Sequence, residues 1–190
     1  MTSWRSTIRS SRASIPALRA ATLIVALLLA FGCARRAPEG GGPAVPSNAG
    51  EVGSKAPNFE LLDLSGKKAQ LSDFTGKVVI LDFWATWCGP CRAEVPDLVR
   101  LQSKYRDKGL LVVGLSLDAE GASAVKPFAE EFNVNYPMLL ANADTARRFG
   151  GIIGIPTTFV LDRQGRIVKK FMGRVEQKTF EEAVQPLLAT

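Results

Sequence analysis

Residues 77–91 read KVVILDFWATWCGPC and place Cys88 and Cys91 two residues apart. Residues 77–84 are almost continuously apolar, which favours a strand buried on both faces of a parallel sheet. Residues 91–106 place apolar side chains at helical spacing with charged residues between them, which favours an amphipathic helix. The pattern changes from strand to helix at the cysteine pair, and we therefore expect Cys88 at the N-terminus of this helix.

A cysteine at a helix N-terminus is favoured as a thiolate. The unpaired backbone N–H groups and the positive end of the helix dipole stabilise the negative charge of the thiolate and lower the pKa of the thiol. Pro90 suits the first turn because its missing N–H would have had no partner, and Gly89 lets another backbone approach closely. Because a thiolate is the attacking species in disulfide exchange, the pattern predicts a redox pair in which Cys88 attacks and Cys91 resolves.

A cysteine pair at this spacing can also form half of a zinc site, or consist of inert core thiols. A four-ligand zinc site needs two more cysteines or histidines, but the chain has no histidine and one further cysteine, Cys33. The change from strand to helix, with Trp87 beside Cys88, argues against an inert pair. We therefore favour redox chemistry and expect no metal site.

The motif WCGPC after VVILDFWAT, with AEVPDL behind it, resembles the active site of the TlpA/ResA group of membrane-tethered thiol–disulfide oxidoreductases, in the thioredoxin-fold superfamily. The resemblance covers residues 52–188. It implies an α/β fold, with a mixed central sheet flanked by helices, an N-terminal β-hairpin and a central insertion. It also implies an enzyme that works by exchange at the two cysteines, without a cofactor.

The rest of the chain alternates between strand and helix patterns. Apolar runs between turn residues predict further strands at 59–63, 69–71, 110–117, 136–140, 157–161 and 166–171. Helical spacing predicts further helices at 122–132, 144–149 and 176–188. Strand–helix–strand units followed by a hairpin and a closing helix give a mixed sheet with helices on both faces.

Residues 1–33 have the features of an export signal. They carry four arginines and no acid, and the apolar stretch 20–31 is too short for a comfortable membrane span. The stretch leads to Gly32-Cys33, as in a bacterial lipoprotein signal, although Phe31 is bulky where a small residue is usual. Lipidation of Cys33, an uncleaved anchor and ordinary cleavage remain three alternatives.

Composition divides the rest of the chain into a tether and a domain. Residues 34–54 are rich in Gly and Pro and poor in large apolar side chains, which predicts a flexible tether. Residues 55–190 suffice for one thioredoxin-like domain, which we expect to be monomeric. Without the four leader arginines the net charge falls from +6 to about +2, since 20 Lys and Arg then face 18 Asp and Glu. Nucleic-acid binding is therefore not expected.

Two carboxylates near the cysteines are candidates for proton transfer. Asp82 lies in the apolar strand six residues before Cys88, where burial would raise its pKa so that it exchanges a proton with Cys91 near neutral pH. Glu94 follows Cys91 by three residues on the same helical face. Alternatively, Asp82 lies at a partly wet sheet edge, and Glu94 is solvated and gains only from the helix dipole. The resemblance implies proton transfer by Asp82 and adjustment of the thiols by Glu94.

The segment GIPTTFV, residues 154–160, is expected to form the other half of the site. Thioredoxin-like proteins place a cis-proline here, facing the cysteines, whereas an Ile-Pro bond alone is more often trans. Backbone beside a cis-proline can pair with an extended substrate chain. The resemblance thus implies a catalytic role for Pro156 and substrate binding by Trp87, Gly89, Pro90 and Ile155.

The favoured function is a protein thiol–disulfide oxidoreductase outside the cytoplasm. A reductant in that oxidising compartment needs electrons delivered through the membrane. The Gly-Pro pair between the cysteines matches thioredoxin, a reductant, whereas strong oxidants of this fold tend to carry a histidine there. The resemblance implies disulfide-bonded apocytochrome c as substrate, a transmembrane electron donor of the DsbD/CcdA type, and attachment to the membrane on the periplasmic side.

Two other functions fit less well. A thiol peroxidase of the peroxiredoxin branch expects Thr or Ser three residues before the reactive cysteine and Pro four residues earlier, where this chain has Ala85 and Leu81. A Cu(I)-binding chaperone would use soft thiolates, but related chaperones have wider cysteine spacing and a histidine.

Overall fold

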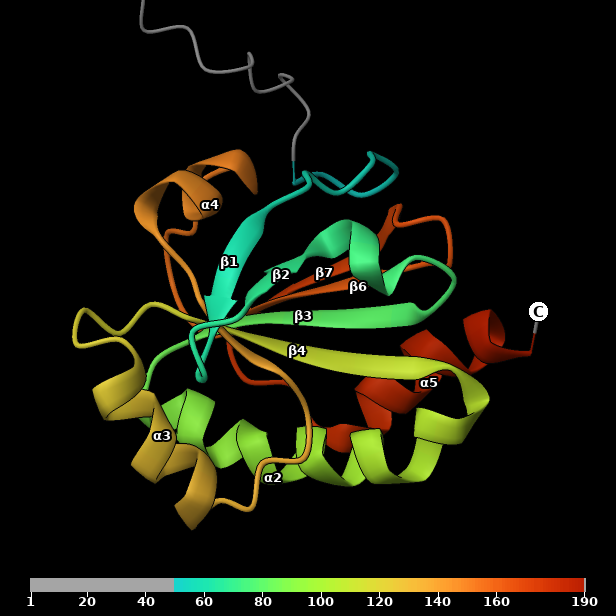
Figure 1. The fold of residues 1–190 in the computed structure, drawn as a ribbon. Helices are drawn as coiled ribbons and strands as arrows, with labels where there is room; N and C mark the ends of the chain where they lie inside the picture. The colour runs from blue at the N-terminus through green and yellow to red at the C-terminus, as the bar shows by residue number, and fades with distance from the viewer. Residues whose placement is uncertain (1–49, 190) are drawn as a thin grey trace, which may run out of the picture. The chain divides into compact units, whose positions relative to one another are not determined.

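A mixed sheet of seven strands runs through residues 50–189, the part of the chain that the computed structural model describes (Figure 1). The strand order is β2-β1-β5-β4-β3-β6-β7, with β3, β4 and β5 parallel and the other neighbours antiparallel. The strands are β1 Glu60–Asp63, β2 Lys68–Gln70, β3 Val78–Trp84, β4 Leu110–Ser116, β5 Met138–Leu140, β6 Thr157–Leu161 and β7 Ile167–Met172. The predicted mixed α/β sheet, with its N-terminal hairpin, is confirmed.

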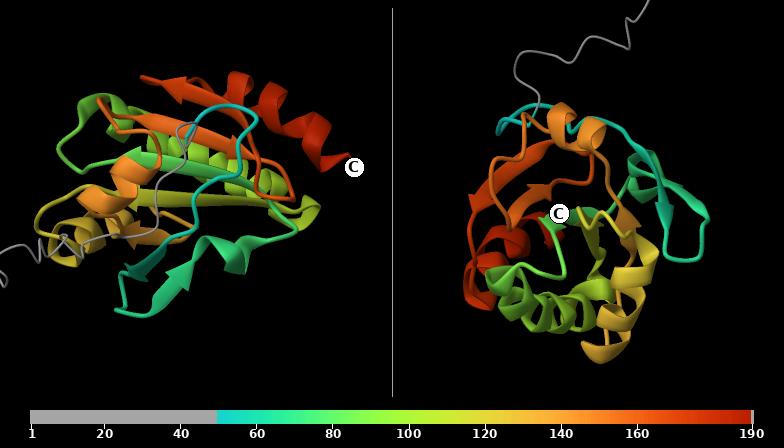
Figure 2. Two further views of the ribbon diagram at one scale, coloured as in Figure 1. Left: turned by 90° about the horizontal axis from the view of Figure 1, so that it is seen from above. Right: turned by 90° about the vertical axis from the view of Figure 1, so that its left-hand side faces the viewer.

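Helices lie on both faces of this sheet (Figure 2). The α-helices are α2 Gly89–Tyr105, α3 Ala122–Glu131, α4 Ala143–Arg148 and α5 Gln177–Leu188, and the 3-10 helices are η1 Leu71–Phe74 and η2 Arg106–Lys108. In Figure 2, α2, α3 and α5 lie on one face and α4 on the other. The helix α3 and the strand β5 lie between β4 and α4 in the chain, and we assign them to the central insertion.

Strand β3 lies inside the sheet, and all seven of its residues are buried. Ile80 and Trp84 point into the core that α2, α3 and α5 cover. Leu81 and Phe83 point into the core on the opposite face. Because successive side chains of a strand alternate between faces, Asp82 shares the face of Ile80 and Trp84 and points toward α2. The alternation thus places a carboxyl group in an otherwise apolar core.

The helix α2 begins at Gly89, two residues before the predicted start. Cys88 is its N-cap: the backbone of Cys88 is extended, and its sulfur accepts a hydrogen bond from the backbone N–H of Cys91 at 3.2 Å. The prediction that Cys88 lies at the helix N-terminus is confirmed. The predicted start is too late because the first turn contains Gly89 and Pro90, which do not contribute to the hydrophobic pattern of the helix.

Residues 50–54 are attached to the sheet, although they belong to the predicted tether. The N–H of Gly53 donates to the carbonyl of Ile167 at 2.7 Å, and the N–H of Ile167 donates to the carbonyl of Ser54 at 2.9 Å. These backbone hydrogen bonds attach the end of the segment to β7, although it has few apolar side chains. The tether at 34–54 stays a prediction.

The leader at residues 1–33, with Cys33, lies outside the described residues, as do residues 34–49 of the predicted tether. Within residues 50–189, no helix combines the length and the apolar character that a membrane crossing requires.

Candidate active site

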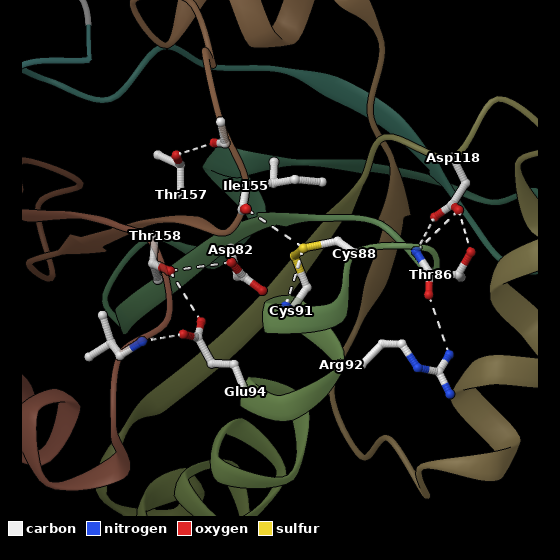
Figure 3. Close-up of a disulfide and its surroundings, with 12 residues drawn as sticks. Asp82, Thr86, Cys88, Cys91, Arg92, Glu94, Asp118, Ile155, Thr157 and Thr158 are labelled. Carbon is white, nitrogen blue, oxygen red and sulfur yellow. Dashed lines mark hydrogen bonds between the residues drawn. A yellow bond between two sulfur atoms is a disulfide. The ribbon is translucent and has the colours of Figure 1, made fainter.

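Cys88 and Cys91 form a disulfide, with an S–S distance of 2.06 Å, at the junction of β3 and α2 (Figure 3). The strand ends at Trp84, and a short loop brings the chain to the N-cap of the helix. Cys88 is 5% exposed and Cys91 is 1% exposed. Cys88 is therefore more accessible to an incoming substrate than Cys91 is.

The Ile155–Pro156 peptide bond is cis, as the resemblance implied. Its segment faces the disulfide, because the carbonyl oxygen of Ile155 lies 3.6 Å from the sulfur of Cys88. On its other side, Pro156 is tied to the end of β7 through its carbonyl, which accepts from the N–H of Gly173 at 2.9 Å. The hydroxyl of Thr157 donates to the carbonyl of Gly154 at 2.6 Å. These bonds fix the segment against the cysteine pair.

The carboxyl groups of Asp82 and Glu94 lie in one buried cluster (Figure 3). Asp82 is 2% exposed and Glu94 is fully buried. The hydroxyl of Thr158 lies 3.2 Å from Asp82 Oδ1 and 3.5 Å from Glu94 Oε1. The backbone N–H of Val175 donates to Glu94 Oε2 at 2.6 Å. The alternatives of an Asp82 at a wet sheet edge and of a solvated Glu94 are therefore wrong, because β3 is an inner strand and both carboxyls lie beneath α2.

Burial is the main cause of the raised pKa values of both acids. It raises the pKa of Asp82 well above its ordinary value, and the nearby Glu94 raises it further. Burial also raises the pKa of Glu94 to about 7, although the hydrogen bond from Val175 lowers it. The two carboxyls therefore titrate as a pair, and Glu94 changes its charge near neutral pH, where a buried thiol needs a proton acceptor.

Trp87, Gly89 and Pro90 lie on the surface around the disulfide. The side chain of Trp87 is 69% exposed, which leaves a large apolar ring free for contact. A Cβ atom built on Gly89 would meet no neighbouring atom within 4 Å. Ile155 is half-buried beside the disulfide. The structure thus brings together the predicted substrate-binding residues, and their roles remain predictions.

A second network, which the sequence analysis missed, holds the loop before Cys88 (Figure 3). The carboxylate of Asp118, which is 8% exposed, accepts hydrogen bonds from the backbone N–H of Thr86 at 3.1 Å, from its hydroxyl at 2.5 Å, and from the hydroxyl of Ser116 at 2.8 Å. A guanidinium N–H of Arg92 donates to the carbonyl of Thr86 at 3.3 Å. Asp118 lies 32 residues from Thr86, and no local pattern links residues at that separation.

Within residues 50–189, no three side chains of His, Cys, Asp or Glu are grouped so as to hold a metal ion. The chemistry that the arrangement supports is exchange at the disulfide itself.

An α/β fold in which the first cysteine of a C-x-x-C pair is the N-cap of a helix, opposite a cis-proline, defines a thiol–disulfide oxidoreductase of the thioredoxin fold. The family model described as Redoxin matches residues 51–187. The chain belongs to the redoxin family, and within it the chain is a TlpA/ResA-like oxidoreductase.

Two curated relatives illustrate this kinship. Thiol-disulfide oxidoreductase ResA of Bacillus thuringiensis is 36% identical over 137 residues, which cover 72% of this chain and 79% of that protein. Thioredoxin-like protein YneN of Bacillus subtilis is 37% identical over 137 residues, which cover 70% of this chain and 78% of that protein.

Two solved structures share the fold. A thiol:disulfide interchange protein of Chlorobium tepidum has a TM-score of 0.65 and 34% identity, covering 71% of this chain and 96% of that one. A secreted thiol-disulfide isomerase of Corynebacterium glutamicum has a TM-score of 0.66 and 31% identity, covering 70% of this chain and 85% of that one. The predicted class of enzyme is confirmed.

Proposed function

We propose that the protein reduces disulfides of other proteins outside the cytoplasm, with Cys88 as the nucleophile. The observation that carries this proposal is the position of Cys88 as N-cap of α2, opposite the Ile155–Pro156 segment. In the reduced protein, the helix N-terminus and the N–H of Cys91 stabilise a thiolate at Cys88. Cys88 is also less deeply buried than Cys91, which favours attack by Cys88.

The reaction is an exchange that transfers two electrons to the substrate. The Cys88 thiolate attacks one sulfur of the substrate disulfide, a mixed disulfide forms, and the other substrate sulfur leaves as a thiolate. Cys91 then loses its proton to the buried acid pair and attacks the sulfur of Cys88. The internal disulfide forms, and the second substrate thiolate is released. Asp82 and Glu94 serve as the proton acceptors, which their raised pKa values support.

The surface around the disulfide suits an extended polypeptide. Trp87 offers an exposed apolar ring, and the open space over Gly89 admits a second backbone. The backbone beside Pro156 faces the sulfur that would carry the substrate, so that a substrate strand can pair there while its cysteine is bonded to Cys88. We assign Trp87, Gly89, Pro90 and Ile155 to this contact.

The reduction potential of the Cys88–Cys91 pair should be that of a reductant, about −270 mV as in thioredoxin rather than about −120 mV as in strong oxidants. Gly89 and Pro90 between the cysteines support this direction, since they match thioredoxin. Equilibration with glutathione buffers of known ratio, followed by thiol trapping and mass spectrometry, measures the value. A potential above roughly −180 mV would reverse the proposed direction.

The extracytoplasmic location is supported by the signal-like pattern of residues 1–33 and by the likeness to the secreted thiol-disulfide isomerase of Corynebacterium glutamicum. In that location the pair needs electrons from a transmembrane donor of the DsbD/CcdA type. The resemblance to the TlpA/ResA group supports disulfide-bonded apocytochrome c as the substrate and a monomeric, membrane-tethered enzyme.

If Cys33 carries a lipid, Cys33→Ala should abolish palmitate labelling of the protein and move it from the membrane fraction to the soluble fraction of cells. Lipidation needs the sulfur of Cys33, whereas an uncleaved anchor does not. Labelling and fractionation of the wild-type protein and the variant, expressed at equal levels, measure both effects. Palmitate labelling that persists in the variant would exclude a lipid on Cys33.

A further inference from the structure

The side chain of Thr158 lies between the two buried carboxyl groups (Figure 3). Asp82 on β3 and Thr158 on β6 are direct partners in the antiparallel register, so that their side chains point to the same face of the sheet. Glu94 reaches the same place from α2, and Thr158 is fully buried. Three elements therefore each contribute one polar group to a small cluster in the core.

The hydroxyl of Thr158 can link the two carboxyls because it donates one hydrogen and also accepts. Its oxygen is 3.2 Å from Asp82 Oδ1 and 3.5 Å from Glu94 Oε1. When one carboxyl is protonated and the other is charged, the hydroxyl accepts from the first and donates to the second. Such a chain of hydrogen bonds is satisfied in either direction, and a proton can pass along it.

The surroundings place the negative charge on Glu94 first. The N–H of Val175 donates to Glu94 Oε2 at 2.6 Å and stabilises its carboxylate. Burial and the neighbouring Glu94 both oppose ionisation of Asp82, whose pKa is raised well above its ordinary value. In Figure 3, however, it is Asp82 that lies between Thr158 and the disulfide. The group that is charged first is thus not the one that lies toward the disulfide in this view.

We propose that Thr158 is a positioning residue that relays a proton from Asp82 to Glu94 and so moves the negative charge next to Cys91. The proton of Asp82 passes to Thr158 Oγ1 while the hydroxyl hydrogen of Thr158 passes to Glu94 Oε1, and the total charge is unchanged. The Asp82 carboxylate then takes the proton of the Cys91 thiol, and the Cys91 thiolate attacks the sulfur of Cys88. This inference rests on the proposed function, in which Cys91 resolves the mixed disulfide.

Other ionisable groups act on the pair from the elements around it. Asp97, also on α2, raises the pKa of Glu94, and Arg174, in the segment before α5, lowers it. Arg174 lies 3.8 Å from Asp97, so that their effects on Glu94 partly cancel. Tyr136, before β5, has a raised pKa because it is buried near both acids, and it stays neutral over the range of interest. These groups set the charge of the pair, whereas Thr158 contacts both of its members.

The test separates the two chemical steps with a small aromatic disulfide that releases one coloured thiolate at each of them. Stopped-flow absorbance then follows attack by Cys88 as a first phase and resolution by Cys91 as a second. All proteins carry the full chain with Cys33→Ala, so that the two active-site sulfurs are the remaining thiols. Rates are measured between about pH 5 and 9, across the pKa of Glu94.

Thr158→Val removes the hydroxyl and keeps the shape of the side chain. We expect it to slow the second phase on the order of tenfold at pH 7, with the first phase within about twofold. The second phase of the wild-type protein should follow the ionisation of Glu94, whereas that of the variant should shift to higher pH. Thr158→Ser, which restores a hydroxyl, should restore both the rate and the profile. The control is Thr145→Val, which should change neither phase; Thr145 is a buried residue of α4 whose hydroxyl donates to Oδ1 of the N-cap residue Asn142.

The proposal is overturned if Thr158→Val leaves the second phase and its pH profile unchanged, or if Thr158→Ser is as slow as Thr158→Val. In a Glu94→Gln background, which lacks the acceptor of the relay, Thr158→Val should slow the second phase by no more than about twofold. Equal slowing in both backgrounds would also overturn it. Should Thr158→Val fail to fold, Thr158→Ala carries the same comparison. A wild-type protein that shows no second phase would instead contradict the proposed function, because Cys91 would then not resolve.

Discussion

Cys91→Ser is expected to hold the protein on its substrate as a stable mixed disulfide through Cys88, whereas Cys88→Ser is expected to capture no substrate. The N-cap position supports attack by Cys88, and a serine hydroxyl at position 91 cannot displace the substrate sulfur. In Cys88→Ser the remaining active-site thiol is that of Cys91, which lies in the first turn of α2 and is 1% exposed. Reductive turnover should fall below detection in both variants.

The measurement uses a protein with an accessible disulfide, such as insulin, mixed with each variant after the variant has been reduced and freed of reductant. Non-reducing electrophoresis counts the adducts, and mass spectrometry of the peptides identifies the sulfur that is bonded. Both variants are made in the Cys33→Ala chain, so that the leader cysteine forms no adduct, and the double cysteine variant measures the background. Equal capture by the two variants, or capture through Cys91, would show that the order of attack is reversed.

The parts of this site that the sequence predicted depend on local pattern. The apolar run of β3 and the helical spacing of α2 place Cys88 at a strand–helix junction, and the structure has the cysteine there. The same alternation that buries Ile80 and Trp84 also points Asp82 toward α2. The pattern of one strand therefore favoured burial of Asp82, whereas the position of β3 inside the sheet excludes the wet edge.

The parts that the sequence did not predict depend on contacts between distant elements. For Glu94 the sequence left a solvated acid and a functional acid as alternatives. The sequence of α2 does not show that Thr158 on β6 and the backbone of Val175 contact this side chain. The sequence gives no functional signal at Thr158, because threonine is a common residue in β-strands. Its position opposite Asp82 requires the register of β3 and β6, which lie 76 residues apart at that point. Asp118 was missed for the same reason.

The buried acids should make the oxidised protein less stable as the pH rises from about 4 to about 7. Below pH 4 a carboxyl is protonated in both the folded and the unfolded protein, and it makes no difference to stability. Above its ordinary pKa of 4.5, Glu94 ionises in the unfolded chain but stays protonated in the folded one until about pH 7. The unfolded state thus binds fewer protons in this interval, and the free energy of unfolding falls. A difference of roughly 2.5 pKa units corresponds to about 3 kcal/mol, and Asp82, whose pKa is also raised, acts in the same direction.

Glu94→Gln isolates this contribution, because the amide oxygen of glutamine can still accept from the N–H of Val175 but the side chain cannot ionise. Relative to the wild-type protein, the variant should gain up to about 3 kcal/mol of unfolding free energy between pH 4 and pH 8. The buried amide can leave a donor unpaired and lower stability at every pH, so the change of the difference with pH is the readout, not its value at one pH. Urea titrations of the oxidised proteins at several pH values measure it, with Glu130→Gln on the exposed face of α3 as the control. Parallel stability curves for Glu94→Gln and the wild-type protein would mean that the carboxyl of Glu94 keeps its ordinary pKa inside the fold, and the assignment of Glu94 as the group that titrates near pH 7 would then be wrong.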